Sequence, residues 1–225
     1  YDVTYQDNIN AGVAKVTIKF KGSYSGSSGK NFTIKSKSVA IPTNSYCNSL
    51  FYNGTSQTLT KTAGEGYTFS NNTGINAISY VVTATLKTNY IWSDGTSTNK
   101  TFTCSIDKKT ATVKAASSSK TYNGSELTKT SGCESSTGLL TNHTATCINK
   151  GTITNAGNTS NVLSEVIIKN GNDDVTSNYN ITKQNGTLTV NKAPTTITLI
   201  ENQATINYTD EITFTVKTSQ AGSLS

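Results

Sequence analysis

Four cysteines carry the most definite chemistry in the sequence: Cys47, Cys104, Cys133 and Cys147. No two of them form a Cys-x-x-Cys motif, and the single histidine cannot complete a zinc site with them at any usual spacing. An even number of cysteines in a chain rich in threonine and asparagine is typical of a secreted protein with two disulfide bonds. The alternative is four buried free thiols in a reducing compartment.

A second candidate site combines aromatic rings with a carboxylate. Tyr90, Trp92 and Asp94 alternate along one short stretch of the chain. Exposed aromatic rings beside polar side chains can stack on sugars, so these three residues are the candidate ligand contact. Tyrosines recur at matching positions, namely Tyr24, Tyr90 and Tyr179, which favours packing inside the fold for them, whereas Trp92 is not matched in the other copies.

The sequence offers few residues of the types that catalysis requires. His143 is its only imidazole, and no Gly-x-Ser-x-Gly motif accompanies it. We therefore expect an exposed loop histidine, no catalytic residue and no cofactor.

Calcium is the metal that the remaining acidic residues would suit best. Asp173 and Asp174 are the first candidates and Asp94 is the next. Calcium takes six to eight oxygen ligands, usually from several converging carboxylates, and these stretches lack the ordered aspartates of a calcium loop. Aspartate and asparagine also favour turns, so no metal site is expected.

The composition suits thin β-sandwiches exposed to water. Of 225 residues, 33% are hydrophobic and 14% charged, which is too apolar for a disordered chain and too polar for a thick core. The net charge of +6 comes from scattered lysines, so no nucleic-acid partner is expected. No apolar run approaches the ~20 residues of a membrane span. No signal peptide opens the chain, so we expect export and anchor signals, if present, to lie outside it.

The chain repeats itself. Three segments share an Asn-Ala pair, an alternating strand, a tyrosine and a closing strand that ends in an aliphatic residue. They run from Asn10-Ala11 to Ile34, from Asn76-Ala77 to Ile106, and from Asn155-Ala156 to Val190. A second landmark occurs as Tyr52-Asn53-Gly54 and as Tyr122-Asn123-Gly124. A period of about 70–85 residues predicts tandem β-modules.

The phase of the repeat sets the expected domain boundaries. Residues 1–36 carry the second half of a module, and residues 193–225 carry the first half of another. Residues 37–108 and 109–192 are the complete modules. The third copy has an insertion between Ile167 and Tyr179.

The strands follow from alternation of apolar and polar residues. In Val16-Thr17-Ile18-Lys19-Phe20 the apolar side chains fall on one face. Asn-Gly and Asp-Gly pairs supply the positive φ of tight turns, and they occur at Asn53, Asp94, Asn123, Asn170 and Asn185. We expect an all-β fold of immunoglobulin-like β-sandwich modules arranged end to end.

These motifs resemble two families of bacterial surface repeats, the mostly-beta, glycine-rich (MBG) domains and the bacterial immunoglobulin-like repeats. The residues that carry the resemblance are Tyr5-x-x-Asn8-x-Asn10-Ala11-Gly12, Tyr80–Leu86 with Tyr90–Thr96, Lys120–Gly124 with Val175–Tyr179, and Gly186-x-Leu188-x-Val190. The resemblance implies β-sandwich modules of extracellular, secreted or cell-surface proteins, which serve as stalks or adhesive tips. It supplies no catalytic residues.

The expected function is therefore that of a non-catalytic spacer, with neighbouring modules as its partners. One alternative is an adhesin module that binds a glycan or protein through loops, for which the insertion in the third copy is the candidate. Another is an accessory module of a secreted carbohydrate-active enzyme. Self-association through the incomplete terminal modules is also expected, whereas membrane insertion of this segment is not.

The module boundaries also predict how the cysteines pair. Four cysteines allow three pairings, and only Cys47–Cys104 with Cys133–Cys147 keeps each bond inside one module.

Overall fold

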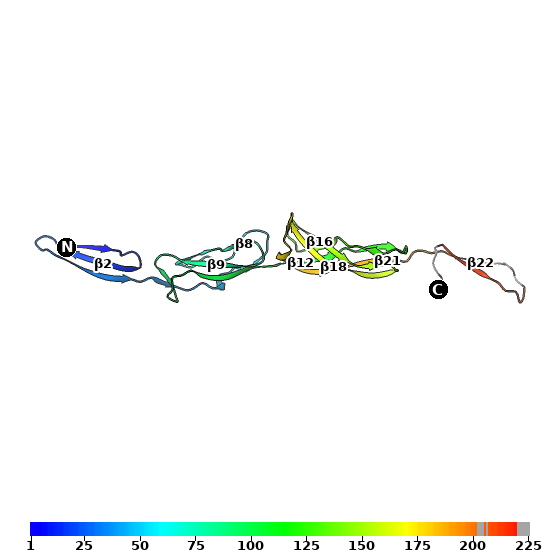
Figure 1. Cartoon of the computed structure of the whole chain (residues 1–225), viewed down its shortest axis with the longest axis horizontal. Helices are drawn as coiled ribbons and strands as arrows, with labels where there is room; N and C mark the ends of the chain where they lie inside the picture. The colour runs from blue at the N-terminus through cyan, green and yellow to red at the C-terminus, as the bar shows by residue number, and fades with distance from the viewer. Residues whose placement is uncertain (202–204, 206, 220–225) are drawn as a thin grey trace. The chain divides into compact units, whose positions relative to one another are not determined.

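The computed structural model describes residues 1–201, 205 and 207–219. Within them the chain is built from β-strands and two 3₁₀ turns, η1 (Asn44–Tyr46) and η2 (Thr176–Asn178) (Figure 1). The all-β class predicted from alternation is confirmed. In these described ranges, no helix has the length and hydrophobicity needed to cross a membrane.

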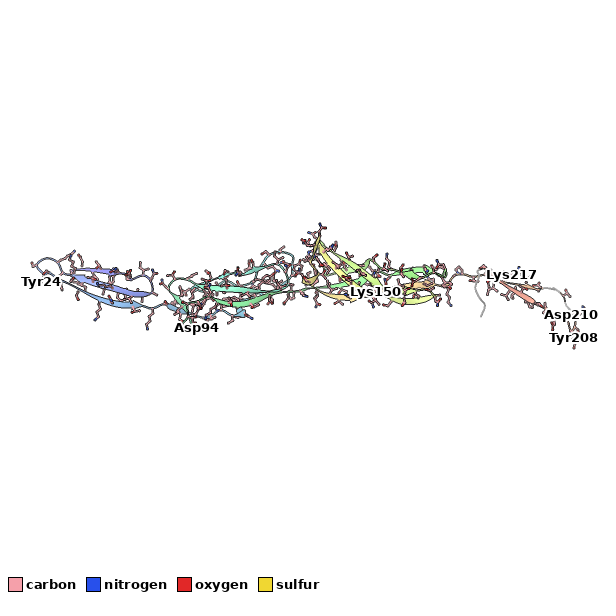
Figure 2. All side chains as sticks on the ribbon, in the orientation of Figure 1. Tyr24, Asp94, Lys150, Tyr208, Asp210 and Lys217 are labelled. Atoms are coloured by element: carbon pink, nitrogen blue, oxygen red, sulfur yellow. A yellow bond between two sulfur atoms is a disulfide. The ribbon has the colours of Figure 1, made fainter. Side chains whose placement is uncertain are left out.

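Residues 1–36 form a single antiparallel sheet of three strands in the order β1-β2-β3. The strands are β1 (Asp2–Gln6), β2 (Gly12–Lys19) and β3 (Ser27–Ile34). Ala14 is buried, but Ile18, Phe20 and Phe32 stay 39–51% exposed. Tyr24, in the loop between β2 and β3, is 77% exposed (Figure 2). Its expected packing role is therefore wrong, because it lies beside a one-layer sheet.

The 37–108 segment has one four-stranded sheet in the order β5-β11-β9-β7 and two small sheets, β10-β4 and β6-β8. Its strands are β4 (Lys37–Val39), β5 (Leu50–Phe51), β6 (Gln57–Thr58), β7 (Tyr67–Ser70), β8 (Thr73–Gly74), β9 (Ser79–Leu86), β10 (Tyr90–Trp92) and β11 (Lys100–Asp107). Strand β11 shows the alternation that builds this core, since Phe102, Cys104 and Ile106 are buried and their neighbours point outward.

The 109–192 segment repeats this plan with larger sheets, β13-β21-β18-β16, β15-β12-β20 and β14-β17. Its strands are β12 (Lys109–Ala115), β13 (Ser118–Thr121), β14 (Leu127–Thr128), β15 (Cys133–Thr137), β16 (His143–Lys150), β17 (Thr152–Ile153), β18 (Gly157–Asn170), β19 (Asp173–Asp174), β20 (Tyr179–Gln184) and β21 (Gly186–Asn191). Leu127, Leu188 and Val190 form one of its core clusters.

The two segments share the strand order of their main sheet, β5-β11-β9-β7 in one and β13-β21-β18-β16 in the other. In each, a short strand pairs in parallel with the closing strand, β5 with β11 and β13 with β21. The tyrosine that follows the short strand then donates its N–H to the end of the closing strand, from Tyr52 to Asp107 O at 2.9 Å and from Tyr122 to Asn191 O at 2.8 Å. Tyr52 and Tyr122 therefore occupy equivalent backbone positions.

The turn glycines follow the prediction with one exception. Gly54, Gly95, Gly124 and Gly171 adopt positive φ. Gly186 does not, and it opens β21 instead. A Cβ at Gly186 would lie 2.7 Å from Ala115 O, so this position needs glycine for the close approach of another strand.

The described part of residues 193–225 forms one antiparallel pair, β22 (Ile197–Glu201) with β23 (Phe214–Thr218). The chain as a whole divides into two compact units. One contains residues 1–111, 138–144 and 169–181, and the other contains residues 112–137, 145–168 and 182–225.

Candidate functional site

Trp92 belongs to the core and not to a ligand surface. Its indole is 0% exposed and packs against Tyr67, with ring centroids 5.4 Å apart. Its Nε1 donates to Thr98 O at 2.8 Å, which satisfies the only polar group of the ring. A sugar cannot stack on an indole that is enclosed in this way, so the predicted role of Trp92 is corrected.

Tyr90 and Asp94 both form hydrogen bonds within the 37–108 segment. The half-buried Tyr90 donates its hydroxyl to Glu65 Oε1 at 2.9 Å, and this hydrogen bond raises the pKa of Tyr90. Asp94 accepts from Lys100 Nζ at 2.7 Å and from Thr96 N at 2.9 Å, and these bonds lower its pKa to about 2. Asp94 thus closes an exposed turn (Figure 2).

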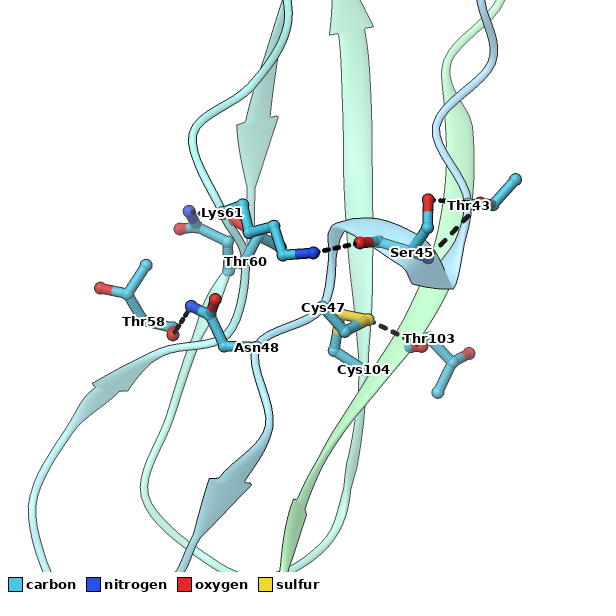
Figure 3. The surroundings of a disulfide bond; sticks show 10 residues. Thr43, Ser45, Cys47, Asn48, Thr58, Thr60, Lys61, Thr103 and Cys104 are labelled. Carbon is cyan, nitrogen blue, oxygen red and sulfur yellow. Dashed lines mark hydrogen bonds between the residues drawn. A yellow bond between two sulfur atoms is a disulfide. The ribbon is translucent and has the colours of Figure 1, made fainter.

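The four cysteines form the two predicted bonds, Cys47–Cys104 and Cys133–Cys147. The first spans 57 residues and joins the stretch before β5 to β11, beside the place where those strands pair. Figure 3 shows it next to a hydrogen bond from Asn48 Nδ2 to Thr58 O at 3.0 Å. The second spans 14 residues and links β15 to β16, which belong to different sheets.

His143 is buried and not exposed as predicted. It begins β16 and is 9% exposed, with Tyr52 and Tyr179 against its ring at centroid distances of 6.0 and 5.8 Å. Its Nδ1 lies 2.7 Å from the Tyr179 hydroxyl, which also accepts from Leu140 N at 3.2 Å. The simplest arrangement has Tyr179 donating to a neutral Nδ1.

Burial sets the titration of this aromatic cluster, defined as Tyr52, His143 and Tyr179. Desolvation lowers the pKa of His143 and raises the pKa of both tyrosines. A hydrogen bond with Asn178 opposes the rise at Tyr52. All three rings are therefore neutral at pH 7, and the cluster serves as packing with polar anchors.

Asn178 makes a two-point contact with the start of β9. Its Oδ1 accepts from Ala77 N at 2.7 Å, and its Nδ2 donates to Asn76 Oδ1 at 3.1 Å. Asn178 is 3% exposed, and both bonds are partly buried. The contact joins residues that are 101 positions apart in the chain.

Asn89 makes the same contact with the start of β2. Its Oδ1 accepts from Ala11 N at 2.7 Å, and its Nδ2 donates to Asn10 Oδ1 at 3.0 Å. Asn89 adopts φ 71°, a conformation that asparagine tolerates better than most residues. We call each of these contacts an Asn clasp, meaning one carboxamide that bonds both residues of an Asn-Ala pair.

No family model, curated protein or solved structure matches this chain. The candidate site therefore rests on the contacts themselves.

Asp173 and Asp174, the first candidates for a calcium site, stabilise a turn. Asp173 and Asp174 form β19, which pairs with the end of β18, and Asp174 Oδ1 accepts from Thr176 N at 2.9 Å. Within residues 1–201, 205 and 207–219, no group of three or more histidine, cysteine, aspartate or glutamate side chains could hold a metal ion.

The residues of the Asn clasp recur visibly in the sequence, but only the structure shows that they contact each other. Asn-Ala pairs and Asn-Tyr pairs both recur in the repeats. Nothing in their spacing says that the asparagine of one copy bonds the alanine of the copy before it, because that contact depends on where two strand ends meet.

Proposed function

We propose that this chain is a non-catalytic spacer segment of an extracellular, cell-surface repeat protein, in which immunoglobulin-like modules stand end to end. The observation that carries the proposal is the recurrence of the Asn clasp, Asn89 on Ala11 and Asn178 on Ala77. A contact repeated with the same atoms at successive Asn-Ala pairs is what a regular array of modules needs.

The connections between predicted modules support the same function. Strand β3 ends at Ile34 and β4 begins at Lys37, while β11 ends at Asp107 and β12 begins at Lys109. A short connection of extended chain leaves little slack. A clasp next to it therefore limits the angles that two neighbouring modules can adopt.

The disulfides support an extracellular location. Bonds of this kind persist in oxidising compartments and are rare in the cytosol. Each closes a loop within one predicted module, so each limits local unfolding there. Resistance to unfolding is a useful property for a surface spacer.

The insertion that favoured an adhesin is engaged by the protein itself. Asn170 lines a hollow of about 260 Å³ together with Asn53, Gly54 and His143. Asn178, at the end of the insertion, makes a clasp. The last residue of the insertion is thus bonded within the protein, and this favours the spacer over a loop free to bind a glycan.

The terminal sheets are the proposed site of self-association. Val3 and Phe32 in the first sheet and Leu199 and Phe214 in the last pair are 40–59% exposed. Two half-modules with uncovered apolar faces can complete each other, so a second copy of the chain is the expected partner there.

The experiment that tests the spacer compares the orientation of residues 1–36 with that of residues 37–108. Residual dipolar couplings of both segments should fit one common alignment tensor in the wild type and two different tensors in Asn89→Ala. Asn99→Ala is the control, because Asn99 is exposed and lies outside the clasp. Two independent tensors in the wild type would contradict the proposal.

A further inference from the structure

We propose that Tyr122, Asn155 and Ala156 form a docking site for the Asn-Tyr turn of a further module of the same kind. The inference deepens the proposed spacer function and rests on it, because it names the partner that the end of the 109–192 segment would take. The partner is defined by its chemistry, an asparagine carboxamide followed by a tyrosine at the end of a β-module.

The backbone of Asn155 and Ala156 matches that of the two clasped pairs. The residue after the alanine pairs in each case with the aliphatic residue near the end of the closing strand. Gly12 pairs with Ile34, Ile78 O accepts from Ile106 N at 3.1 Å, and Gly157 pairs with Val190. Gly12 and Gly157 also share an unusual φ, 147° and 150°. Ala156 therefore occupies the position of Ala11 and Ala77.

The third pair differs from the other two in its surroundings. Ala11 and Ala77 are half-buried and their N–H groups donate to a carboxamide at 2.7 Å. Ala156 is exposed, and among the described residues its N–H has no protein acceptor. The same backbone position is thus clasped twice and open to solvent once.

Tyr122 gives independent support from another element. It occupies the backbone position of Tyr52, since both donate an N–H to the end of a closing strand. Tyr52 is 3% exposed because Tyr179 and His143 cover its ring, whereas Tyr122 is 39% exposed. In the 37–108 segment, residues of the next segment cover Tyr52. In the 109–192 segment, the equivalent Tyr122 is uncovered.

The chemistry of the clasp selects asparagine. The carboxamide must accept from a backbone N–H and donate to an asparagine Oδ1 at the same time, which needs both of its ends. Aspartate lacks the donor and would face the Asn155 oxygen with a negative charge. The tyrosine after the asparagine supplies the ring that covers Tyr122, as Tyr179 covers Tyr52.

The test uses the full chain with a second copy of residues 109–192 inserted between Lys192 and Ala193. Hydrogen exchange of the Ala156 amide should slow by about tenfold or more relative to the original chain. Tyr122 should also become protected from solvent in nitration or photo-oxidation footprinting. Unchanged exchange at Ala156 beside a folded inserted copy would overturn the inference.

The matched variant carries Asn178→Ala in the inserted copy alone. It should return Ala156 to fast exchange and leave Ala77 protected, because the original Asn178 is intact. If the inserted copy does not fold, a copy of residues 37–108 is inserted in its place. Exchange at Ala156 should then be slow when the inserted Asn89 is intact and fast when it is replaced by alanine. Fast exchange at Ala156 with Ala11 and Ala77 protected overturns this inference only. Fast exchange at Ala11 and Ala77 in the original chain overturns the proposed function.

Discussion

The carboxamide of Asn178 lies 2.7 Å from the backbone nitrogen of Ala77 and accepts its hydrogen bond. Asn178 is the last residue of the insertion in the third copy, and Ala77 lies just before the long strand β9 in the second copy. Asn89 and Ala11 repeat this relationship at the same distance. In both cases the Asn-Ala pair of one copy donates its alanine N–H to the asparagine of the Asn-Tyr pair in the next copy.

Replacing Asn178 with alanine should weaken the contact that its carboxamide makes with Asn76 and Ala77. The variant removes two partly buried hydrogen bonds and leaves the Ala77 N–H without its acceptor, which costs about 1–3 kcal/mol. Hydrogen exchange at Ala77 should accelerate, and urea unfolding should report the loss. Asn99→Ala, at an exposed position, should change neither. An Ala77 amide that stays protected in Asn178→Ala would show that the clasp contributes nothing.

Trp92→Ala should destabilise the 37–108 segment by about 3–5 kcal/mol, because it empties a fully buried site beside Tyr67 and Ala84. Tyr90→Phe is the comparison, since it removes only the exposed hydrogen bond to Glu65 and should change stability far less than Trp92→Ala. Unfolding of both variants can be followed by circular dichroism. A stable Trp92→Ala variant would restore the interpretation of Trp92 as a surface residue.

The two disulfides should differ in their contribution to stability. A loop of 57 residues gives about 4 kcal/mol in the chain-entropy account and a loop of 14 gives about 3. Denaturation of the Cys47→Ala/Cys104→Ala and Cys133→Ala/Cys147→Ala double variants measures both values. Trp92 fluorescence follows the 37–108 segment, since it is the only tryptophan, and amide exchange in β21 follows the other. Loss of stability in the wrong segment for either pair would contradict the assignment of the bonds.

Acidification should destabilise the aromatic cluster of Tyr52, His143 and Tyr179. Burial holds the pKa of His143 below its unfolded value of about 6.5, so the unfolded chain binds the proton more readily than the folded one. This contribution is complete above pH 6.5 and is lost as the pH falls toward the lower folded pKa. Between pH 7.5 and 5 the free energy of unfolding should fall by at most about 1.4 kcal/mol per pH unit.

The His143→Gln variant provides the control for the pH series, because glutamine does not titrate. Its stability should be nearly flat over the same range. Asp94 and Glu65, which pair with lysines, do not titrate in this range, because hydrogen bonds lower the pKa of both carboxyl groups. Equal slopes for wild type and His143→Gln would exclude His143 as the source.

The strands and the disulfides could be predicted because their signals are local. Alternation over Val82–Leu86 places Val82 and Ala84 on one face, and both are buried in β9. The pairing of cysteines followed from the phase of the repeat. These features depend on neighbours in the sequence or on a simple count.

The roles of Trp92, His143 and Asn89 could not be predicted because their partners are distant. The residues that enclose His143 include Tyr52 and Tyr179, which lie far away on either side in the sequence. The sequence neighbours of Trp92 are of the types found beside aromatic rings that stack on sugars. Its burial becomes clear only from the packing of Tyr67 against its ring. Gly186 follows an asparagine as turn glycines do, but a second strand decides its conformation.

Solution X-ray scattering on the monomer tests the spacer most directly, with a concentration series to exclude association through the terminal sheets. Short connections and clasped ends predict modules in line. Each module of ~35 Å then gives a rod of ~100 Å and a radius of gyration near ~29 Å. A compact body of the same length would give about 17 Å. A measured value near ~29 Å is the predicted result, and a value near ~17 Å would contradict the proposal that this chain holds its modules end to end.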